Sequence, residues 1–131
     1  MNNADLRILL VDDHAVVRAG YRHLLETQGG FKQVREAENA QEAYSTCQKE
    51  LPGLIICDIS MPEPVGLNLV QRVLGRWPEV KFLMFTMHNS IELARACMDA
   101  GAKGYVTKSS RPEVLLRAIG EVLAGRTFMS A

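Results

Sequence analysis

Short apolar runs alternate along the chain with longer stretches in which apolar residues recur every three or four positions. The short runs have the length of strands, and the longer stretches have the spacing of amphipathic helices. Strands are predicted over residues 6–11, 31–37, 54–58, 80–86 and 104–108. Helices are predicted over residues 15–28, 39–50, 66–77, 90–101 and about 111–123. This regular alternation predicts a parallel sheet with helices on both faces.

The most apolar of these strands, "LIICD" at 54–58, is expected at the centre of the sheet. Strands buried on both faces read as continuous apolar runs, and the first and fourth strands share this character. Because right-handed crossovers leave few topologies, we expect a flavodoxin-like, doubly wound α/β sandwich with five strands in the order 2-1-3-4-5. It would form one domain over residues 1–131, with a core over about 5–125.

Polar residues before three helices match the capping box, in which an N-cap side chain and a later Glu satisfy free N–H groups. The pairs are Asn39 with Glu42, Asn89 with Glu92, and Ser110 with Glu113. Pro112 then falls in the first helical turn, where its missing N–H does no harm. On this last helix Val114 lies off the apolar stripe centred on Ile119, which predicts an exposed side chain.

Composition narrows the class of protein. The apolar fraction of 47% and the charged fraction of 23% are ordinary for a globular domain. The net charge is zero, which gives no electrostatic reason to expect binding to nucleic acid or to an anionic membrane. No apolar run approaches the roughly 20 residues of a membrane helix, and "MNNADLR" does not read as a signal peptide. Cys47, Cys57 and Cys97 fit neither a disulfide framework nor a zinc motif, so we expect buried thiols in a cytoplasmic protein.

The stretch "LLVDDHAVV" at 9–17 runs from the first strand straight into two adjacent acids. Asp12 and Asp13 repel each other, and at the end of a buried strand they lose part of their hydration. One interpretation is that Asp13 simply caps the next helix. His14 could tune a metal site beside the two acids, but it is interpreted in the same way as Asp13, as a polar residue at a helix start. The ends of the other strands decide between capping and a binding site.

Polar side chains also stand at the carboxyl ends of the later strands. Asp58 ends the third strand, Thr86 the fourth and Lys108 the fifth. Neighbouring strands lie about 5 Å apart, so Asp13 and Thr86 would flank Asp58. Lys108 lies two strands away, and its long side chain could close much of that gap of about 10 Å. Each residue alone has an ordinary structural explanation, but their convergence predicts a functional crevice.

The chemistry of this crevice suits phosphoryl transfer. Carboxylate oxygens are the ligands that Mg²⁺ or Mn²⁺ prefers, and such an ion would relieve the repulsion between Asp12 and Asp13. A carboxylate beside a divalent ion, a hydroxyl and a lysine offers a nucleophile, together with groups that hold the oxygens of a transferred phosphoryl group.

Four segments resemble the receiver domain of two-component response regulators. They are "VDDH", "CDISMP" with Gly66 following, "FT" at 85–86 and "GYVTK" at 104–108. The resemblance covers about residues 5–125, and "ILLVDDHAVVRAG" and "AIGEVLAGRTFMS" are most similar to the NarL/LuxR-type (FixJ-like) subfamily. Members of that subfamily carry a helix-turn-helix output domain beyond a short linker. Such a domain is expected in the full-length protein and absent from this chain.

The resemblance implies that Asp58 accepts a phosphoryl group from a phosphohistidine on a sensor histidine kinase. Asp13 and Asp58 would ligate Mg²⁺ directly, with the backbone carbonyl of Ser60 as a third protein ligand and Asp12 acting through water. The chain would thus be a signalling module rather than a metabolic enzyme.

Thr86 and Lys108 would contact the phosphoryl oxygens, by the same resemblance. Tyr105 would be the switch aromatic: phosphorylation draws the Thr86 hydroxyl inward, which opens space into which the Tyr105 ring turns. Phosphorylation is expected to promote a weak symmetric homodimer, and DNA binding is expected to reside in the output domain, not in this fragment.

The sequence departs from the family pattern near the site. Pro64 is expected to stiffen the loop after Asp58, and Val65 removes a usual polar contact. Met87, where many relatives carry a smaller residue, would screen part of the phosphoryl site. Ser109 replaces a frequent proline, which leaves the isomer of the Lys108–Ser109 peptide open.

Two other functions are weaker fits. A phosphatase of the haloacid dehalogenase type would need a second acid two residues after Asp58, where this chain has Ser60. A flavin or nucleotide carrier would need a glycine-rich or hydroxyl-rich phosphate loop after the first strand, where "DDHAVV" supplies acids.

Overall fold

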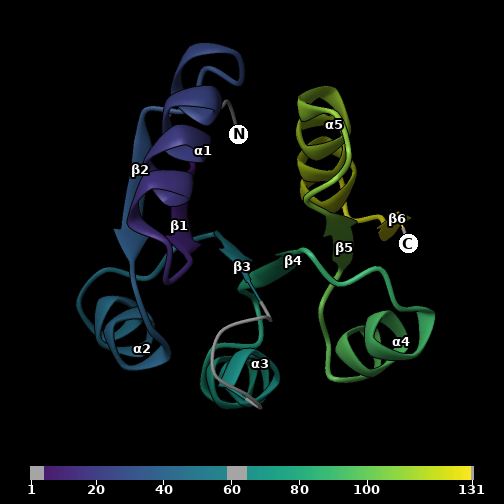
Figure 1. Cartoon of the computed structure of the whole chain (residues 1–131). Helices are drawn as coiled ribbons and strands as arrows, with labels where there is room; N and C mark the ends of the chain where they lie inside the picture. The colour runs from purple at the N-terminus through teal and green to yellow at the C-terminus, as the bar shows by residue number, and fades with distance from the viewer. Residues whose placement is uncertain (1–4, 59–64, 131) are drawn as a thin grey trace.

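The computed structural model describes residues 5–58 and 65–130, which form a three-layer α/β sandwich (Figure 1). The strands are β1 (Arg7–Val11), β2 (Gln33–Ala37), β3 (Leu54–Cys57), β4 (Lys81–Thr86), β5 (Gly104–Thr107) and β6 (Phe128–Ser130). The helices are α1 (Ala15–Thr27), α2 (Ala40–Lys49), α3 (Val65–Arg76), α4 (Ile91–Asp99) and α5 (Pro112–Leu123). The predicted elements are confirmed, because the apolar periodicity of each segment matches the face that it buries.

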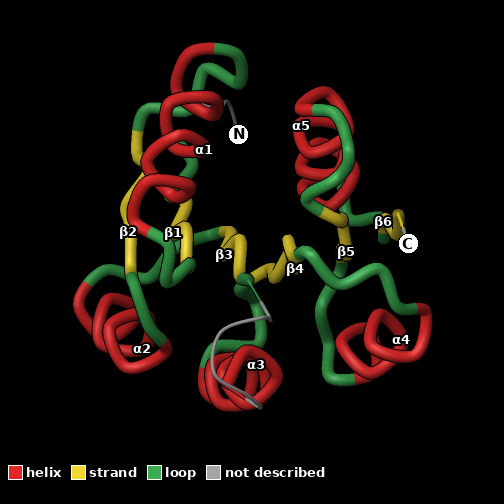
Figure 2. Tube along the Cα trace, viewed as in Figure 1, coloured by secondary structure: helices red, strands yellow, loops and turns green. Residues whose placement is uncertain are grey.

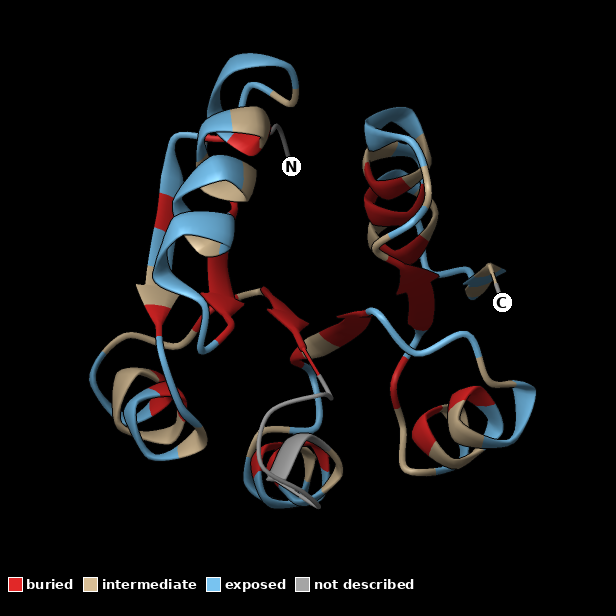
Figure 3. Ribbon diagram, in the orientation of Figure 1, coloured by how far each residue is buried: buried red, intermediate tan, exposed pale blue. Residues whose placement is uncertain are grey.

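One sheet separates two apolar cores. Helices α1 and α5 cover one face, and α2, α3 and α4 cover the other (Figure 1). Alternate strand residues point to opposite faces, so Leu9 packs toward the α2–α4 layer and Ile8 toward the α1–α5 layer. Buried residues line the strands and the inner sides of the helices (Figure 3). The three cysteines are free and buried, as predicted.

The sheet has the order β2-β1-β3-β4-β5-β6, which confirms the predicted arrangement and adds a sixth strand. Strand β6 lies beside β5 at the edge of the sheet and runs parallel to it (Figure 2). The prediction of five strands was therefore one short. Only three residues form β6, which is too short a segment for an alternating pattern to be legible.

Two predicted caps are wrong. The Asn39 side chain does accept from the Glu42 N–H at 2.8 Å, as expected. For α4, however, Ser90 rather than Asn89 is the N-cap, and its hydroxyl accepts from the Leu93 N–H at 3.2 Å. For α5 the N-cap is Arg111, without a side-chain cap. The hydroxyl of Ser110 instead lies 3.2 Å from Thr107 Oγ1 and 3.5 Å from Ser130 Oγ, because β5 and β6 pass close to it.

The exposed position expected for Val114 is also wrong. Its side chain is partly buried and packs against the core of the α1–α5 layer. Within the described ranges 5–58 and 65–130, no helix is long and apolar enough to cross a membrane.

The register of the strands positions the polar residues at their ends. Val11 pairs with Cys57, and Cys57 pairs with Met84, so Asp12 and Asp58 follow residues that lie level in the sheet. The next pair, Thr86 and Thr107, brings Lys108 to the same edge.

Candidate functional site

The centre of the site is an ion-pair cluster between the ends of β1, β3 and β5. Lys108 Nζ lies 2.5 Å from Asp12 Oδ2 and 2.9 Å from Asp58 Oδ2. All three side chains are buried, with 5%, 2% and 6% of the Asp12, Asp58 and Lys108 side chains exposed. Two carboxylates thus share one ammonium group, and the cluster retains a net negative charge.

The charge of Lys108 is secured by these contacts. Burial alone would lower the pKa of the ammonium group, because it penalises the charged form. The hydrogen bonds to Asp12 and Asp58 and the attraction of both carboxylates outweigh that effect and raise the pKa of Lys108 above its ordinary value. Lys108 is therefore a cation throughout the physiological pH range.

Asp12 is held by several neighbours. Its N–H donates to the Ala37 carbonyl at 3.1 Å, which extends the pairing of β1 with β2 by one residue. Its Oδ1 accepts from the His14 N–H at 2.8 Å, while Oδ2 receives Lys108. The turn from β1 into α1 thus fixes a carboxylate that points to the end of β3.

Asp13 lies at the rim of the site, and 39% of its side chain is exposed. His14 Nδ1 lies 3.0 Å from Asp13 Oδ1 and 3.3 Å from Asp12 Oδ1. The N-cap of α1 is His14, without a side-chain cap bond, so the capping interpretation of Asp13 does not hold. His14 does start the helix, and its ring also lies beside both acids.

The donor set fits a hard divalent cation. Ligand atoms of Asp12, Asp13, His14 and Asp58 all lie within 4.8 Å of one another. Three carboxylates at that spacing, partly exposed to water at Asp13, match the oxygen-rich and partly hydrated shell that Mg²⁺ favours. Ser60, the expected carbonyl ligand, lies outside the described residues, as does Pro64.

Thr86 and Tyr105 meet through the backbone of His88. The His88 N–H donates to Thr86 Oγ1 at 3.2 Å, and the Tyr105 hydroxyl donates to the His88 carbonyl at 2.6 Å. Thr86 and Tyr105 are both fully buried, so the Tyr105 ring already occupies an inward position in this structure. Burial raises the pKa of Tyr105 to about 12, which keeps its hydroxyl a donor. Met87, between Thr86 and His88, is 67% exposed.

Arg18 and Glu36 also belong to the site, and the sequence analysis missed both. Arg18 Nη1 donates to the backbone carbonyl of Asp12, and Arg18 Nε donates to Glu36 Oε1 at 2.7 Å. The only sequence signal was an arginine on the predicted α1 and an acid on the predicted edge strand, and such residues are usually solvated. Their spatial pairing depends on the packing of α1 against β2.

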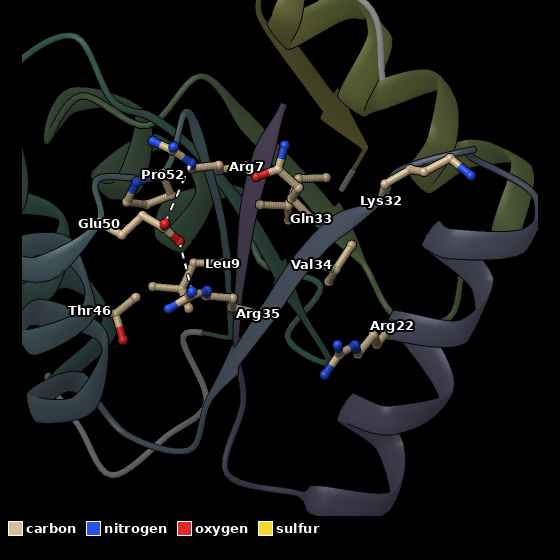
Figure 4. Close-up of a pocket in the computed structure, with 11 residues that line it drawn as sticks. Arg7, Leu9, Arg22, Lys32, Gln33, Val34, Arg35, Thr46, Glu50 and Pro52 are labelled. Atoms are coloured by element: carbon tan, nitrogen blue, oxygen red, sulfur yellow. Dashed lines mark ion pairs between the residues drawn. The ribbon is translucent and has the colours of Figure 1, made fainter. Parts of the chain in front are cut away.

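A separate cavity of about 270 Å³ lies toward the amino ends of β1 and β2 (Figure 4). Two of its cations contact one acid: Arg35 Nη2 lies 3.0 Å from Glu50 Oε1, and Arg7 Nε lies 4.0 Å from Glu50 Oε2. These are partly exposed surface pairs, which contribute little energy. Because open parallel sheets place their reactive groups at the carboxyl ends of strands, the acidic cluster is the better candidate site.

Comparison with known proteins places this geometry in a family. The sequence profile described as the response regulator receiver domain matches residues 8–120. The transcriptional activator protein ExaE of Pseudomonas putida is 41% identical over 93% of this chain and 57% of its own length. The response regulator UvrY of Escherichia coli K12 is 35% identical over 96% of this chain and 58% of its own length. The chain therefore spans less than two thirds of these relatives.

A solved structure gives the same result for the fold. The crystal structure of a LuxR-family two-component response regulator from Aurantimonas sp. SI85-9A1 superposes with a TM-score of 0.90 at 42% identity. The match covers 95% of this chain and 89% of that one. The flavodoxin-like fold and the resemblance to LuxR-type regulators are thereby confirmed.

Proposed function

This chain belongs to the response regulator receiver family, and on that premise we propose that it is a phosphorylation-activated switch with Asp58 as its phosphoacceptor. The observation that carries this proposal is the buried Asp58 carboxylate at the end of β3, 2.9 Å from Lys108 Nζ and grouped with two further acids. A nucleophilic carboxylate beside a fixed cation is the arrangement that transfer of a phosphoryl group to aspartate requires.

The donor is a phosphohistidine on a sensor histidine kinase. A carboxylate oxygen of Asp58 forms a bond to phosphorus while the P–N bond breaks, and the imidazole nitrogen leaves with the electron pair of that bond. Lys108 neutralises charge on the phosphoryl oxygens from its position between Asp12 and Asp58. Thr86, at the end of the adjacent strand, donates its hydroxyl to one of the same oxygens.

Asp13 and Asp58, with the carbonyl of Ser60, would hold Mg²⁺ or Mn²⁺ directly, and Asp12 would act through water. When bound, the ion offsets the charge of the carboxylates and of the incoming phosphoryl oxygens. Asp12 and Asp13 project from the same backbone turn, so this turn would set the direction of both carboxylates toward the ion. Lys108 offsets the repulsion between Asp12 and Asp58.

Thr86 and Tyr105 are the switch in this proposal. When the Thr86 hydroxyl moves to the phosphoryl group, His88 loses its N–H contact and the segment after β4 rearranges. Since Tyr105 donates to the carbonyl of the same residue, a movement of the His88 backbone would change the position of the buried Tyr105 side chain. Phosphorylation would thus favour one conformation of the surface formed by α4 and β5.

The switch would serve transcription in the cytoplasm. The relatives, a transcriptional activator and a response regulator, extend well beyond the matched region, which supports a DNA-binding, helix-turn-helix output domain in the full-length protein. We assign DNA contact to that domain. The receiver region described here would pair with the kinase and form a weak homodimer that phosphorylation promotes.

Intact mass after incubation with acetyl phosphate tests the proposal. The chain should gain one phosphoryl group in the presence of Mg²⁺ but not after its removal by chelation, and hydroxylamine should release the group as expected for an acyl phosphate. Asp58→Asn should abolish the gain, whereas Asp99→Asn, the same change at an exposed position on α4, should retain it. Undiminished labelling of Asp58→Asn would refute the assignment.

A further inference from the structure

We infer that Arg18 is a positioning residue of the acidic site, which it controls through the backbone carbonyl of Asp12. This inference rests on the proposed function and deepens it, because it names a residue that sets the geometry of the cation ligands without touching the phosphoryl group.

The guanidinium of Arg18 spans two strand ends. Its Nη1 donates to the Asp12 carbonyl at the end of β1, and its Nε donates to Glu36 Oε1 on β2 at 2.7 Å. Only 13% of the Arg18 side chain is exposed, so water competes weakly for these contacts. Glu36 is fixed in turn, because its Oε2 accepts from Arg22 Nη1 at 3.1 Å.

The contact acts on the peptide that carries both acids. The Asp12 carbonyl belongs to the peptide unit that joins Asp12 to Asp13, so its direction sets the plane from which both residues project. The Asp12 N–H is already fixed by the Ala37 carbonyl. With the carbonyl held as well, the start of the turn into α1 has little freedom to rotate.

Geometry, not net charge, is the basis of this role. The positive charge of Arg18 is matched by Glu36. Burial opposes ionisation of Glu36, but the hydrogen bonds from Arg18 and Arg22 outweigh it and lower the pKa of this carboxyl. The pair therefore adds little net charge to the site. A guanidinium presents several donors in a rigid fork and bridges two acceptors at once, which a lysine ammonium of shorter reach does not reproduce.

Charge-conserving variants of the full 131-residue chain separate an effect of the hydrogen-bond geometry from an effect of the positive charge. In Arg18→Lys the charge remains and the bridge is lost. Binding of Mn²⁺, measured by electron paramagnetic resonance of the free ion, should weaken by about tenfold, as is typical when an outer partner of a metal ligand is removed. Arg22→Lys is the matched control, because Arg22 contacts Glu36 but not the Asp12 carbonyl, and it should keep wild-type affinity. Thermal unfolding without metal ensures that each titration is made on folded protein.

Each outcome decides a different question. If wild-type protein binds no Mn²⁺, the proposed cation site itself fails. If wild-type binds and Arg18→Lys binds equally well, the positioning role of Arg18 is overturned. A loss of melting temperature in Arg18→Lys with unchanged Mn²⁺ affinity would reduce Arg18 to a purely structural residue. An equal loss of affinity in Arg22→Lys would replace the role of Arg18 with a general effect of the Glu36 network.

Discussion

The hydroxyl of Tyr105 donates a hydrogen bond of 2.6 Å to the backbone carbonyl of His88, and this bond joins β5 to the segment that follows β4. The N–H of the same residue donates to Thr86 Oγ1. One backbone residue therefore contacts both members of the proposed switch. A displacement of the Thr86 hydroxyl would therefore be transmitted to Tyr105 through the backbone of His88.

Thr86→Ala should uncouple phosphorylation from the conformational response. The variant retains Asp58 and Lys108, so it should still be labelled by acetyl phosphate, but the hydroxyl that links the phosphoryl group to His88 is gone. Amide chemical shifts of β4 and β5 should then change less on phosphorylation than in wild-type protein. Tyr105→Phe tests the other half of the link and should cost about 1 kcal/mol of unfolding free energy, as is typical for a lost hydrogen bond. Equal shifts in Thr86→Ala and wild type would contradict the coupling.

Lys108→Met should destabilise the unphosphorylated protein strongly. The substitution leaves the Asp12 and Asp58 carboxylates buried together without their shared cation. Removal of one partner from a buried ion pair typically costs about 3–5 kcal/mol, which urea unfolding at pH 7 would measure. Lys103→Met, at the exposed lysine directly before β5, should cost far less.

The difference in unfolding free energy between wild type and Lys108→Met should depend on pH. The pKa of Lys108 is raised above its ordinary value of 10.5, since its hydrogen bonds outweigh the effect of burial. Its stabilisation is therefore complete below pH 10.5 and is lost as the pH rises through the higher folded-state value. On the alkaline side of neutrality, the difference in stability between wild type and Lys108→Met should shrink only in that range above pH 10.5. A difference that already shrinks between pH 7 and pH 9 would contradict the assignment.

The fold was largely predictable from the sequence because apolar periodicity decides which segments bury a face. Every predicted strand and helix ends within two residues of its observed bounds. Strand β6 was missed because its three residues are held by pairing with β5 rather than by a pattern of their own. The cap of α4 fell on Ser90 rather than Asn89, since neighbouring polar residues compete for one position and backbone geometry selects between them.

The site was predictable as far as topology alone determines it. Parallel strands carry the acids after β1, Asp58 and Lys108 to one edge whatever the details of packing, but Asp12 rather than the expected Asp13 lies level with Asp58. Contacts that cross elements were not predictable in this way. Arg18 contacts Glu36, which lies 18 residues away in the sequence. Arginine is also common at exposed helix positions, so the residue type alone does not indicate this contact. His14 likewise reads as a helix start, and its second contact, with Asp13, depends on how the turn folds back.

Asp13→Asn should leave the metal-free protein about as stable as wild type. Asp13 lies at the rim, partly exposed and paired with His14, so its removal relieves some repulsion and loses one weak contact. The gain in melting temperature on addition of Mg²⁺ should be much smaller than in wild type, because one ligand is gone. Asp99→Asn is the control for a lost surface charge. Equal Mg²⁺-dependent stabilisation in Asp13→Asn and wild type would remove Asp13 from the ligand set.

This 131-residue chain should not bind duplex DNA measurably at physiological salt. Its net charge is zero, so it releases few counterions from the phosphate backbone and gains little affinity from that source. A gel-shift titration on random duplex DNA, with and without acetyl phosphate, is the measurement. Binding at micromolar concentration or tighter would overturn this expectation.

Phosphorylation should promote a weak symmetric dimer. The partly buried Val114 no longer singles out α5 as the face involved. Met87 and Ile91 are better placed, because both are exposed apolar side chains, one directly after Thr86 and the other at the start of α4. A surface that rearranges with Thr86 would present these side chains differently after phosphorylation, which would make pairing conditional on the phosphoryl group. Sedimentation velocity should show faster-sedimenting protein after treatment with acetyl phosphate, and Ile91→Glu should abolish this shift without loss of labelling. Asp58→Asn should sediment as a monomer throughout, while a strict monomer in phosphorylated wild type would favour a mechanism without receiver pairing.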